Sequence, residues 1–465
     1  MILKCTRIIA IASGFLGMVC QAGSFSLYME DNGSAVGNFA AGIAAEAADA
    51  STGWYNPAGL ALLNKQQFLL SGVWVFPTMK MSGYSLYETP IPFGDPAQYI
   101  ESFDNLQDRE SAVVPSIHYS YPLHPGVVAG LSIVAPFGLS SNWPKSSAVR
   151  YAGTFTSLRT LNISPELGAE LTSHFAIGAG LDFQYANVTF DSIVGSPAFL
   201  NELELPPNGL DTTTHNKGDS LGIGFHAGVL SYFHDKHTRV GINYQSRIAH
   251  QFYGSSTLSG RLATPALDIA LDPLGGDPNA VFEMDSLRTN SVSLPDIVTT
   301  SFYQDLNDRW AVLGSVVYTN WSLFNTLKLY NVAAPIVTPE LESSPGSITQ
   351  VVQEGYRDAW RLALGANYRI NSKWMLRCGG GYDETPTTNA ERDVRLPDAD
   401  RIALSIGAHY QWLPKIGIDA GYTHLFVHNS QIDKSQPLED NINVIHASTE
   451  GVVNLWGAQV LWDIE

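Results

Sequence analysis

Apolar and polar residues alternate along much of the chain with a period of two. Between residues 401 and 412, for example, Ile402 and Leu404 alternate with small or polar residues, and segments 360–370 and 175–185 repeat this pattern. Successive side chains of a β-strand point to opposite faces, so the pattern predicts strands with one apolar face. The longest apolar run after the N-terminus is 126–139, which contains proline and glycine and is too short for a transmembrane helix.

About fourteen segments carry this pattern. They lie near residues 66–76, 112–122, 126–144, 154–171, 174–190, 219–232, 237–253, 288–304, 309–331, 351–370, 373–383, 399–412, 416–428 and 450–464. Short connections such as 172–173 alternate with long ones such as 191–218 and 254–287. Short turns on one side and long loops on the other are typical of outer-membrane barrels. We therefore expect an all-β protein, a 14-stranded antiparallel transmembrane β-barrel over residues 65–465.

The composition narrows the class of protein further. Charged residues make up only 15% of the chain, hydrophobic residues 45%, and the mean hydropathy is −0.01. A soluble protein usually carries more charge, and a bundle of membrane helices would be far more hydrophobic. The net charge of −18 excludes a general nucleic-acid partner, which would need a basic surface. Trp310, Trp321, Tyr410, Trp412, Trp456 and Trp462 lie near predicted strand ends, as expected of interfacial aromatic girdles.

The N-terminus has the three parts of a secretory signal peptide. Lys4 and Arg7 precede an apolar stretch from Ile8 to Val19, and small residues follow up to Ala22. We therefore predict a signal peptide over residues 1–22, the alternative being a retained hydrophobic helix. Cys378 is the one cysteine that remains after cleavage, so the exported protein has no internal disulfide.

Residues 23–64 precede the first predicted strand and are rich in glycine and alanine. They also carry aromatic residues such as Phe25, Phe39 and Trp54, which a free periplasmic tail would leave exposed to water. We therefore expect this segment to form a plug, or hatch, inside the barrel lumen.

Several short motifs occur in order along the chain and resemble one known family. They are Ser34 to Gly42, Asn56-Pro57-Ala58-Gly59-Leu60, Tyr121-Pro122-Leu123, Ala135 to Leu139, Leu158 to Ile163, Ser293 to Asp296, Tyr318 to Ser322, Glu354 to Arg361 and Leu396 to Arg401. This ordered set is similar to the FadL family of outer-membrane long-chain fatty-acid transporters, which includes the TodX-type aromatic hydrocarbon channels.

The resemblance implies uptake of hydrophobic molecules into a cell through the bacterial outer membrane. Ligand would be captured among external loops, where this chain has the apolar residues Phe199, Leu200, Leu203, Leu267 and Ile269. It would then enter an internal apolar pocket stoppered by Phe25 and leave sideways where the third strand is kinked. The candidate residues for that lateral exit are Pro136, Phe137 and Gly138, and those for the hatch are Asn56, Pro57 and Ala58. A proline removes a hydrogen-bond donor from a strand, which favours a break there.

The nature of the ligand stays open at the level of sequence. The fatty-acid-binding members place basic residues where this chain has Ser192 and Val352, so Lys328, Arg357 and Arg361 are the substitutes expected to bind a carboxylate. Without such a cation, a carboxylate would enter an apolar pocket at a considerable cost in free energy. A neutral aromatic or aliphatic hydrocarbon is the alternative ligand, and a non-selective water-filled porin is the alternative function.

Other sequence signals favour a transporter that is not an enzyme. Gly218 to Gly222 match the G-x-S-x-G nucleophile pattern around Ser220, but an alternating strand rather than a helix follows. His234 and His237 flank a predicted turn and could share a metal, but no cluster of carboxylates or cysteines completes a site there. We expect a monomer in contact with outer-membrane lipid, with no cofactor, no metal, no catalytic residue and no nucleic-acid partner.

Overall fold

The three-dimensional structure is a computed structural model that describes residues 25–89, 96–108, 110–338, 341–438 and 441–464. The predicted signal peptide, residues 1–22, lies outside the described residues. Among the residues that are described, no helix is long and apolar enough to cross a membrane. The short helices are η1 (Ala35–Asn38), α2 (Thr52–Tyr55), η2 (Pro57–Leu62), α3 (Pro197–Glu202), η3 (Arg261–Ala263) and η4 (Trp321–Leu323).

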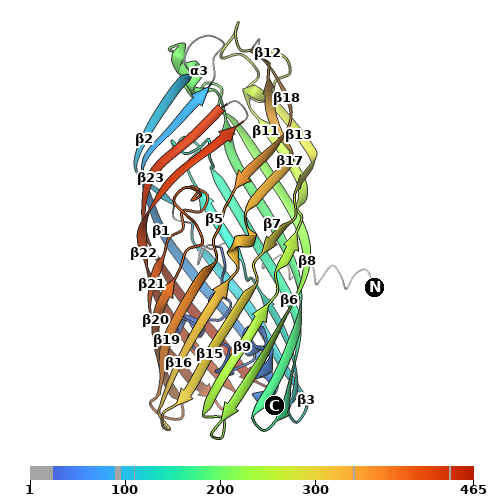
Figure 1. The fold of residues 1–465 in the computed structure, drawn as a ribbon, viewed down its shortest axis with the longest axis vertical. Coiled ribbons are helices and arrows are strands. Elements are labelled where there is room, and N and C mark those ends of the chain that lie inside the picture. Colours follow the sequence, from blue (N-terminus) through green and yellow to red (C-terminus); the bar gives the residue numbers. More distant parts are fainter. Residues whose placement is uncertain (1–24, 90–95, 109, 339–340, 439–440, 465) are drawn as a thin grey trace.

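Fourteen strand positions form a closed antiparallel ring, which confirms the predicted strand number (Figure 1). In ring order they are β1 (Gln67–Thr89), β3 (Ala112–His124), β4 (Val127–Val134) continued by β5 (Gly138–Asn142), β6 (Phe155–Thr172), β7 (Phe175–Val194), β8 (Thr212–Phe233), β9 (Thr238–Gln245), β15 (Ile297–Asp305), β16 (Trp310–Thr319), β19 (Ala359–Arg369), β20 (Trp374–Asp383), β21 (Arg401–Leu413), β22 (Ile416–Leu438) and β23 (Asn441–Asp463). The ring closes between β1 and β23, which pair from Gln67 and Asp463 to Glu88 and Ile442. Closure gives each wall strand a hydrogen-bonded neighbour on both sides over at least part of its length.

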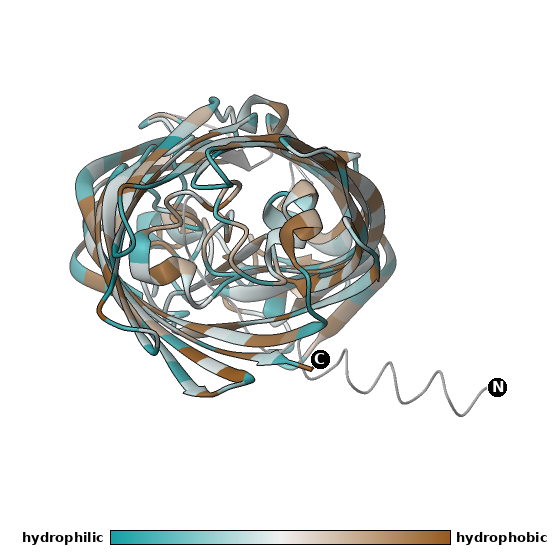
Figure 2. Cartoon of the chain, turned by 90° about the horizontal axis from the view of Figure 1, so that it is seen from below, coloured by the Kyte–Doolittle hydropathy of each residue, from teal (hydrophilic) through white to brown (hydrophobic). Residues whose placement is uncertain are grey.

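The wall sorts side chains by the period of two. In β21, Ile402, Leu404 and Ile406 are exposed on the outside, whereas Ala403 and Ser405 are buried on the inside. Seen along the barrel, apolar and polar positions alternate around the ring of strands (Figure 2). The outer surface is thus apolar because lipid covers it, and the inner surface carries small and polar residues.

Further strands extend the wall at the end of the barrel that carries the long loops, at the top of Figure 1. They are β2 (Ala97–Asp108), β11 (Tyr253–Ser259), β12 (Leu267–Asp268), β13 (Val281–Thr289), β17 (Thr326–Val337) and β18 (Glu342–Gln353). The small strands β10 (Ile248–His250) and β14 (Val292–Leu294) pair with each other below this extension. Much of what we expected to be loop is therefore strand. The alternation signal fades there because residues beyond the membrane need no apolar outer face.

Four predicted strands are interrupted at a common level. The segments expected over 237–253, 288–304, 309–331 and 351–370 break near residues 246–252, 290–296, 320–325 and 354–358. Tyrosine hydroxyls bind aspartates at these breaks: Tyr244 donates to Asp296 and Tyr318 to Asp358, both at 2.7 Å. The breaks let backbone and side chains turn inward, and an interior cavity lies at this level.

Candidate functional site

Residues 25–64 cross the interior of the ring. Helix η1 contacts β19 through β23, whereas η2 contacts β4, β6, β7 and β8 on the other side of the barrel. Most residues of this N-terminal segment are buried, including Phe39, Trp54 and Tyr55. The small side chains that suggested a plug allow the chain to pass close to the strands.

The Asn56 to Ala58 turn fixes the segment to the wall. The Asn56 side chain accepts a hydrogen bond from the Ala58 backbone N–H at 3.1 Å and donates to the carbonyl oxygens of Ala44 and, on β8, Val229. Opposite the turn, a Cβ atom built on Gly178 would lie 2.2 Å from the Pro57 carbonyl carbon. Glycine is therefore needed on β7 for this close approach.

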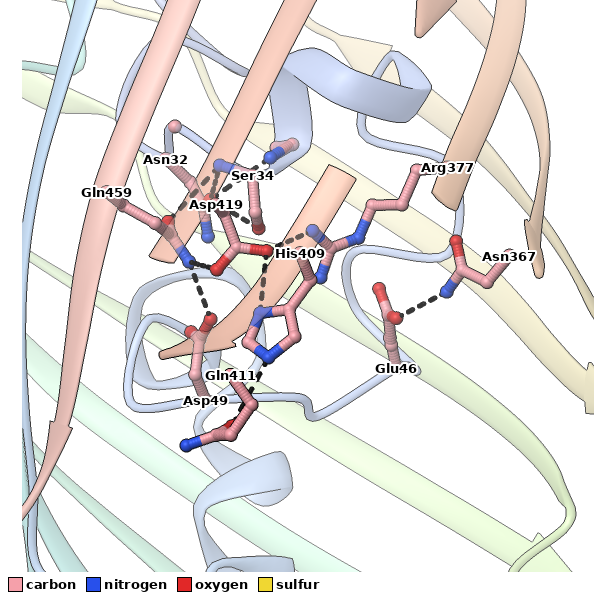
Figure 3. Close-up of polar contacts among 12 residues, drawn as sticks. Asn32, Ser34, Glu46, Asp49, Asn367, Arg377, His409, Gln411, Asp419 and Gln459 are labelled. Carbon is pink, nitrogen blue, oxygen red and sulfur yellow. Dashed lines mark hydrogen bonds and ion pairs between the residues drawn. The ribbon is translucent and has the colours of Figure 1, made fainter. Parts of the chain in front are cut away.

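A buried polar network joins the segment to the C-terminal strands (Figure 3). The Asp49 carboxylate accepts hydrogen bonds from Ser51 and from the Gln459 amide, at 3.2 Å in the latter case. The same amide donates to Asp419 at 3.1 Å, and Asp419 forms an ion pair with Arg377. His409 and Ser34 complete the network by binding Asp419 and Gln459, respectively.

A second acidic residue of the segment, Glu46, lies beside this network. Its carboxylate accepts a hydrogen bond from the Asn367 amide at 2.8 Å (Figure 3). Burial raises the pKa of Glu46 and that of Asp49 above their ordinary values, although Arg377 opposes the shift in both cases. Repulsion by Asp49 adds to the increase in the pKa of Glu46, and repulsion by Asp419 adds to that of Asp49. Removing these carboxylates from water therefore costs free energy that the neighbouring cation only partly offsets.

The third wall strand is interrupted at the predicted place. Strand β4 ends at Val134, and β5 begins at Gly138. Besides β6, residues of the N-terminal segment pair with the break: the Leu27 N–H donates to the Pro136 carbonyl and the Gly138 N–H to the Phe25 carbonyl, both at 2.9 Å. Strands β3 and β4 pair only as far as Ile117 and Ile133, so the ladder between them stops at the break.

An apolar cavity lies inside the barrel at the level of the breaks. Its apolar lining consists of Phe25, Leu139, Leu158, Val188, Phe190, Phe252, Val292, Leu294, Phe324, Leu327, Tyr356 and Leu396. Phe25 is the lining residue that belongs to the N-terminal segment. Its ring centre lies 4.5 Å from that of Trp321 and 5.3 Å from that of Phe324.

Trp321 was expected in an interfacial girdle, but it is an interior residue. It is 2% exposed and lies on η4, where the chain turns inward between β16 and β17. The regular alternation of β16 stops before this residue, so its face cannot be read by extending the strand pattern. Trp310 and Trp456, within uninterrupted strands, are exposed on the outer surface.

The polar lining of the cavity includes a cation that sequence reasoning missed. Arg395 lies on loop 384–398, which folds into the barrel, and its guanidinium donates to the Thr156 hydroxyl at 2.9 Å and to the Asp191 carbonyl at 3.3 Å. Glu354 also lines the cavity, and burial raises its pKa to about 7. The sequence offered one hint, an arginine just before the Leu396 to Arg401 motif, but nothing in it showed that this loop turns inward.

The three predicted carboxylate partners lie elsewhere. Lys328 is exposed on β17, and half-exposed Arg357 binds the Thr385 carbonyl and Glu384. Arg361 is buried beneath the cavity, where it donates to the Phe39 carbonyl and stacks 4.0 Å from the ring centre of Phe39. Arg361 lines a smaller, polar cavity that also contains Asp383. None of the three lines the apolar cavity.

The predicted capture residues come together at the loop end. Leu200, Leu267 and Ile269 are buried in one cluster with Leu210 and Leu262, and Phe199 packs against it. Leu203 is 45% exposed beside this loop cluster. The residues thus pack on one another, while part of their apolar surface faces solvent.

Groups of apolar side chains lie between the loop cluster and the cavity. Val194 packs against both the loop cluster and a second group formed by Leu258, Ala263 and Ala333. A third group, against which Phe190 and Phe324 of the cavity pack, consists of Leu287, Val292, Leu327, Leu329 and Val332. We call these groups the apolar track; its second and third groups share no residue.

The remaining sequence candidates have ordinary structural surroundings. Ser220 lies within β8, and its hydroxyl accepts a hydrogen bond from the Gln251 backbone N–H at 3.2 Å. His237 binds Asp305 next to a turn. Ser192 hydrogen-bonds Thr214, and Val352 packs against the third apolar group.

A closed antiparallel barrel with an apolar outer surface and long loops at one end defines an integral outer-membrane protein. The chain matches the family described as outer membrane protein transport protein (OMPP1/FadL/TodX) over residues 14–463. It therefore belongs to this family of outer-membrane transport proteins.

Named relatives support the same assignment. The chain is 28% identical over 429 residues to a long-chain fatty acid transport protein of Escherichia coli O6:H1, covering 90% of each chain. It is 27% identical over 427 residues to outer membrane protein P1 of Haemophilus influenzae, covering 87% of this chain and 86% of that one. These relatives are transport or outer-membrane proteins rather than enzymes.

Solved structures share the fold. A FadL homologue of Pseudomonas aeruginosa superposes with a TM-score of 0.78 at 22% identity, covering 95% of this chain and all of that one. The toluene transporter TbuX of Ralstonia pickettii gives a TM-score of 0.57 at 16% identity, covering 93% and 98%.

Proposed function

We propose that this protein takes hydrophobic molecules through the outer membrane into the cell. Residues 1–22 serve as the signal peptide, residues 23–64 form the hatch, and residues 65–465 form the barrel, which acts as a monomer in contact with outer-membrane lipid. The loop cluster around Leu200, Leu203 and Ile269 captures the ligand, and the apolar track leads it to the cavity.

One observation carries the proposal. Phe25 lines the apolar cavity, and its backbone carbonyl pairs with Gly138 at the interruption of the third wall strand. A displacement of this one residue would therefore open the cavity toward the break. Since the β3–β4 ladder stops there, the molecule released would pass sideways between strands rather than along the barrel axis.

The hatch closes the axial route in this proposal. The turn at Asn56 and the network around Asp49 hold it to opposite sides of the ring. A ligand that leaves sideways needs no movement of these attachments. Relatives named as fatty-acid and toluene transporters make a fatty acid or a neutral hydrocarbon the candidate ligands.

Replacing the kink by strand-forming residues tests the lateral exit. The variant Pro136→Val with Gly138→Val restores the missing backbone donor and favours continuous pairing, so we expect uptake of a labelled fatty acid or hydrocarbon to fall to background. Pro165→Val, on an exposed position of the uninterrupted β6, is the matched control and should retain uptake.

Assembly of the barrel is checked by the heat-dependent gel mobility of the folded form. Unchanged uptake by the folded kink variant would refute the lateral exit. Planar bilayers containing the wild-type protein should show no steady conductance, whereas large open-channel currents would favour the water-filled porin.

A further inference from the structure

The cavity is apolar over most of its surface but has one charged end. Arg395, Asp393 and Glu354 line it there, beside the Thr156 hydroxyl. A pure hydrocarbon would leave these groups without any new partner. Burying charged groups against a neutral ligand costs free energy, so the charged end indicates a ligand with a polar head.

Arg395 lines this cavity and forms no ion pair with any of the residues that the structure describes. Among the described residues, no carboxylate oxygen lies within 4 Å of its guanidinium, whereas the nearby cations Arg401 and Lys434 form ion pairs with Asp398 and Glu391. Its hydrogen-bond acceptors are the neutral Thr156 hydroxyl and Asp191 carbonyl. Burial lowers the pKa of Arg395, and the attraction of Asp393, Glu354 and Asp191 opposes this shift.

The two acids at this end leave the cation available. The Asp393 carboxylate accepts a hydrogen bond from the backbone N–H of Arg395, at 3.0 Å, rather than from its guanidinium. Glu354 has a pKa of about 7, so it is partly protonated near neutral pH and can then donate a hydrogen bond to an anionic head group. Both features favour binding of an anion at Arg395.

Loop 384–398 holds Arg395 in place by contacts on both sides. The Trp143 indole N–H donates to the Val394 carbonyl at 3.0 Å. Leu396, the residue after Arg395, is buried and contributes to the apolar lining of the cavity. The loop thus presents a cation and an apolar side chain together, which matches a molecule with an acidic head and an aliphatic tail.

We propose that Arg395 determines ligand specificity by binding the carboxylate of an aliphatic acid in this cavity. The proposal rests on the function proposed above, and it assigns the head-group contact to an inward-folded loop instead of the positions occupied by Ser192 and Val352. The tail then lies among residues such as Phe190, Phe252 and Leu327.

Binding of palmitate and of 1-hexadecanol to the purified protein at pH 7 tests this assignment. The two probes share a tail and differ in the charge of the head. Arg395→Gln should weaken palmitate binding about tenfold to a hundredfold and leave hexadecanol binding within about twofold of wild type. Arg395→Lys, which keeps the charge, should restore most of the preference for palmitate, and Arg288→Gln, at an exposed position of β13, should match wild type.

Two results would overturn the assignment. Equal losses for both probes in Arg395→Gln would mean that Arg395 only supports the loop, and no loss for either probe would remove it from the site. If Arg395→Gln does not assemble, Arg395→Lys is the deciding variant. We expect it to keep most of the preference for palmitate over hexadecanol, and loss of that preference would contradict the proposal. A wild-type protein that binds neither probe would instead refute the proposed function, and with it this inference.

Discussion

Single residues of this barrel matter because they allow the N-terminal segment to lie close to the wall strands. Gly178 faces the Pro57 carbonyl so closely that any side chain would collide with the hatch turn. Asn56 then uses both ends of its amide, one to cap η2 and one to reach β8. Local sequence rules could identify Asn-Pro as a turn, but the partner on β7 lies more than a hundred residues away.

Gly178→Ala tests this close approach. We expect it to destabilise hatch docking by about 1–3 kcal/mol, because the new methyl group overpacks a rigid backbone contact. The measurement is the urea midpoint of the refolded protein. Gly72→Ala is the control, since its Cβ would meet only ordinary contacts at 3.9–4.0 Å, and equal midpoints for the two variants would contradict the prediction.

At the scale of elements, loop 384–398 replaces a missing piece of wall. Above the breaks, β18 pairs with β17 and β12, whereas the upper part of β22 pairs with β23. The loop lies between these two groups of strands: the Asp433 N–H donates to the Asn389 carbonyl at 2.9 Å, and Lys434 binds both Glu391 and the Gln353 carbonyl. Individual hydrogen bonds, rather than a strand ladder, thus hold this roof of the cavity.

A disulfide between Asn389→Cys and Asp433→Cys, in a Cys378→Ser background, should lock the loop. We expect oxidation to slow ligand uptake at least about tenfold and reduction to restore it, because entry requires the roof to move. The control is Ser430→Cys with Thr449→Cys, whose native hydroxyls lie 2.6 Å apart within the β22–β23 pair and do not involve the loop. Equal uptake by the oxidised and reduced locked variant would show that the ligand enters elsewhere.

For the whole molecule, the buried carboxyl groups Glu46 and Asp49 make the docking of the N-terminal segment dependent on pH. Glu46 and Asp49 have raised pKa values in the folded protein, so protonation stabilises the folded state relative to the unfolded chain. The contribution of these two groups to the stability of the folded protein is fully present below the ordinary carboxyl pKa. It is lost as the pH rises through their raised pKa values in the folded state. With respect to these two groups, docking of the N-terminal segment therefore weakens as the pH rises above the ordinary carboxyl pKa.

The double variant Glu46→Gln and Asp49→Asn should reduce this pH dependence. Between pH 5 and pH 8 we expect the thermal midpoint of wild type to fall more than that of the variant, since the variant carries no charge to bury. Glu450→Gln removes an exposed carboxylate that lies 3.9 Å from Lys80 and should follow wild type. Parallel curves for all three proteins would contradict this account.

The sequence by itself determined the barrel, its strand number and the outward direction of its apolar faces. Each of these follows from the period of two and from the order of short and long connections, which are local properties of the chain. The break at Pro136 to Gly138 was expected from the resemblance, and the proline and glycine there, which weaken a strand, agreed with it. These features depend on neighbours in sequence, so no long-range contact is needed to read them.

Only the tertiary structure decided what lines the cavity. Trp321 and Arg395 lie where strands are interrupted and the chain turns inward, and there the alternation no longer tells which side of the wall a residue faces. Lys328 was expected from its position in the sequence to bind a ligand carboxylate, but it is exposed on β17 and does not line the cavity. The charged end of the site arises from loop 384–398 meeting β6 and β7 across the barrel, a contact that depends on closure of the ring and has no local signal.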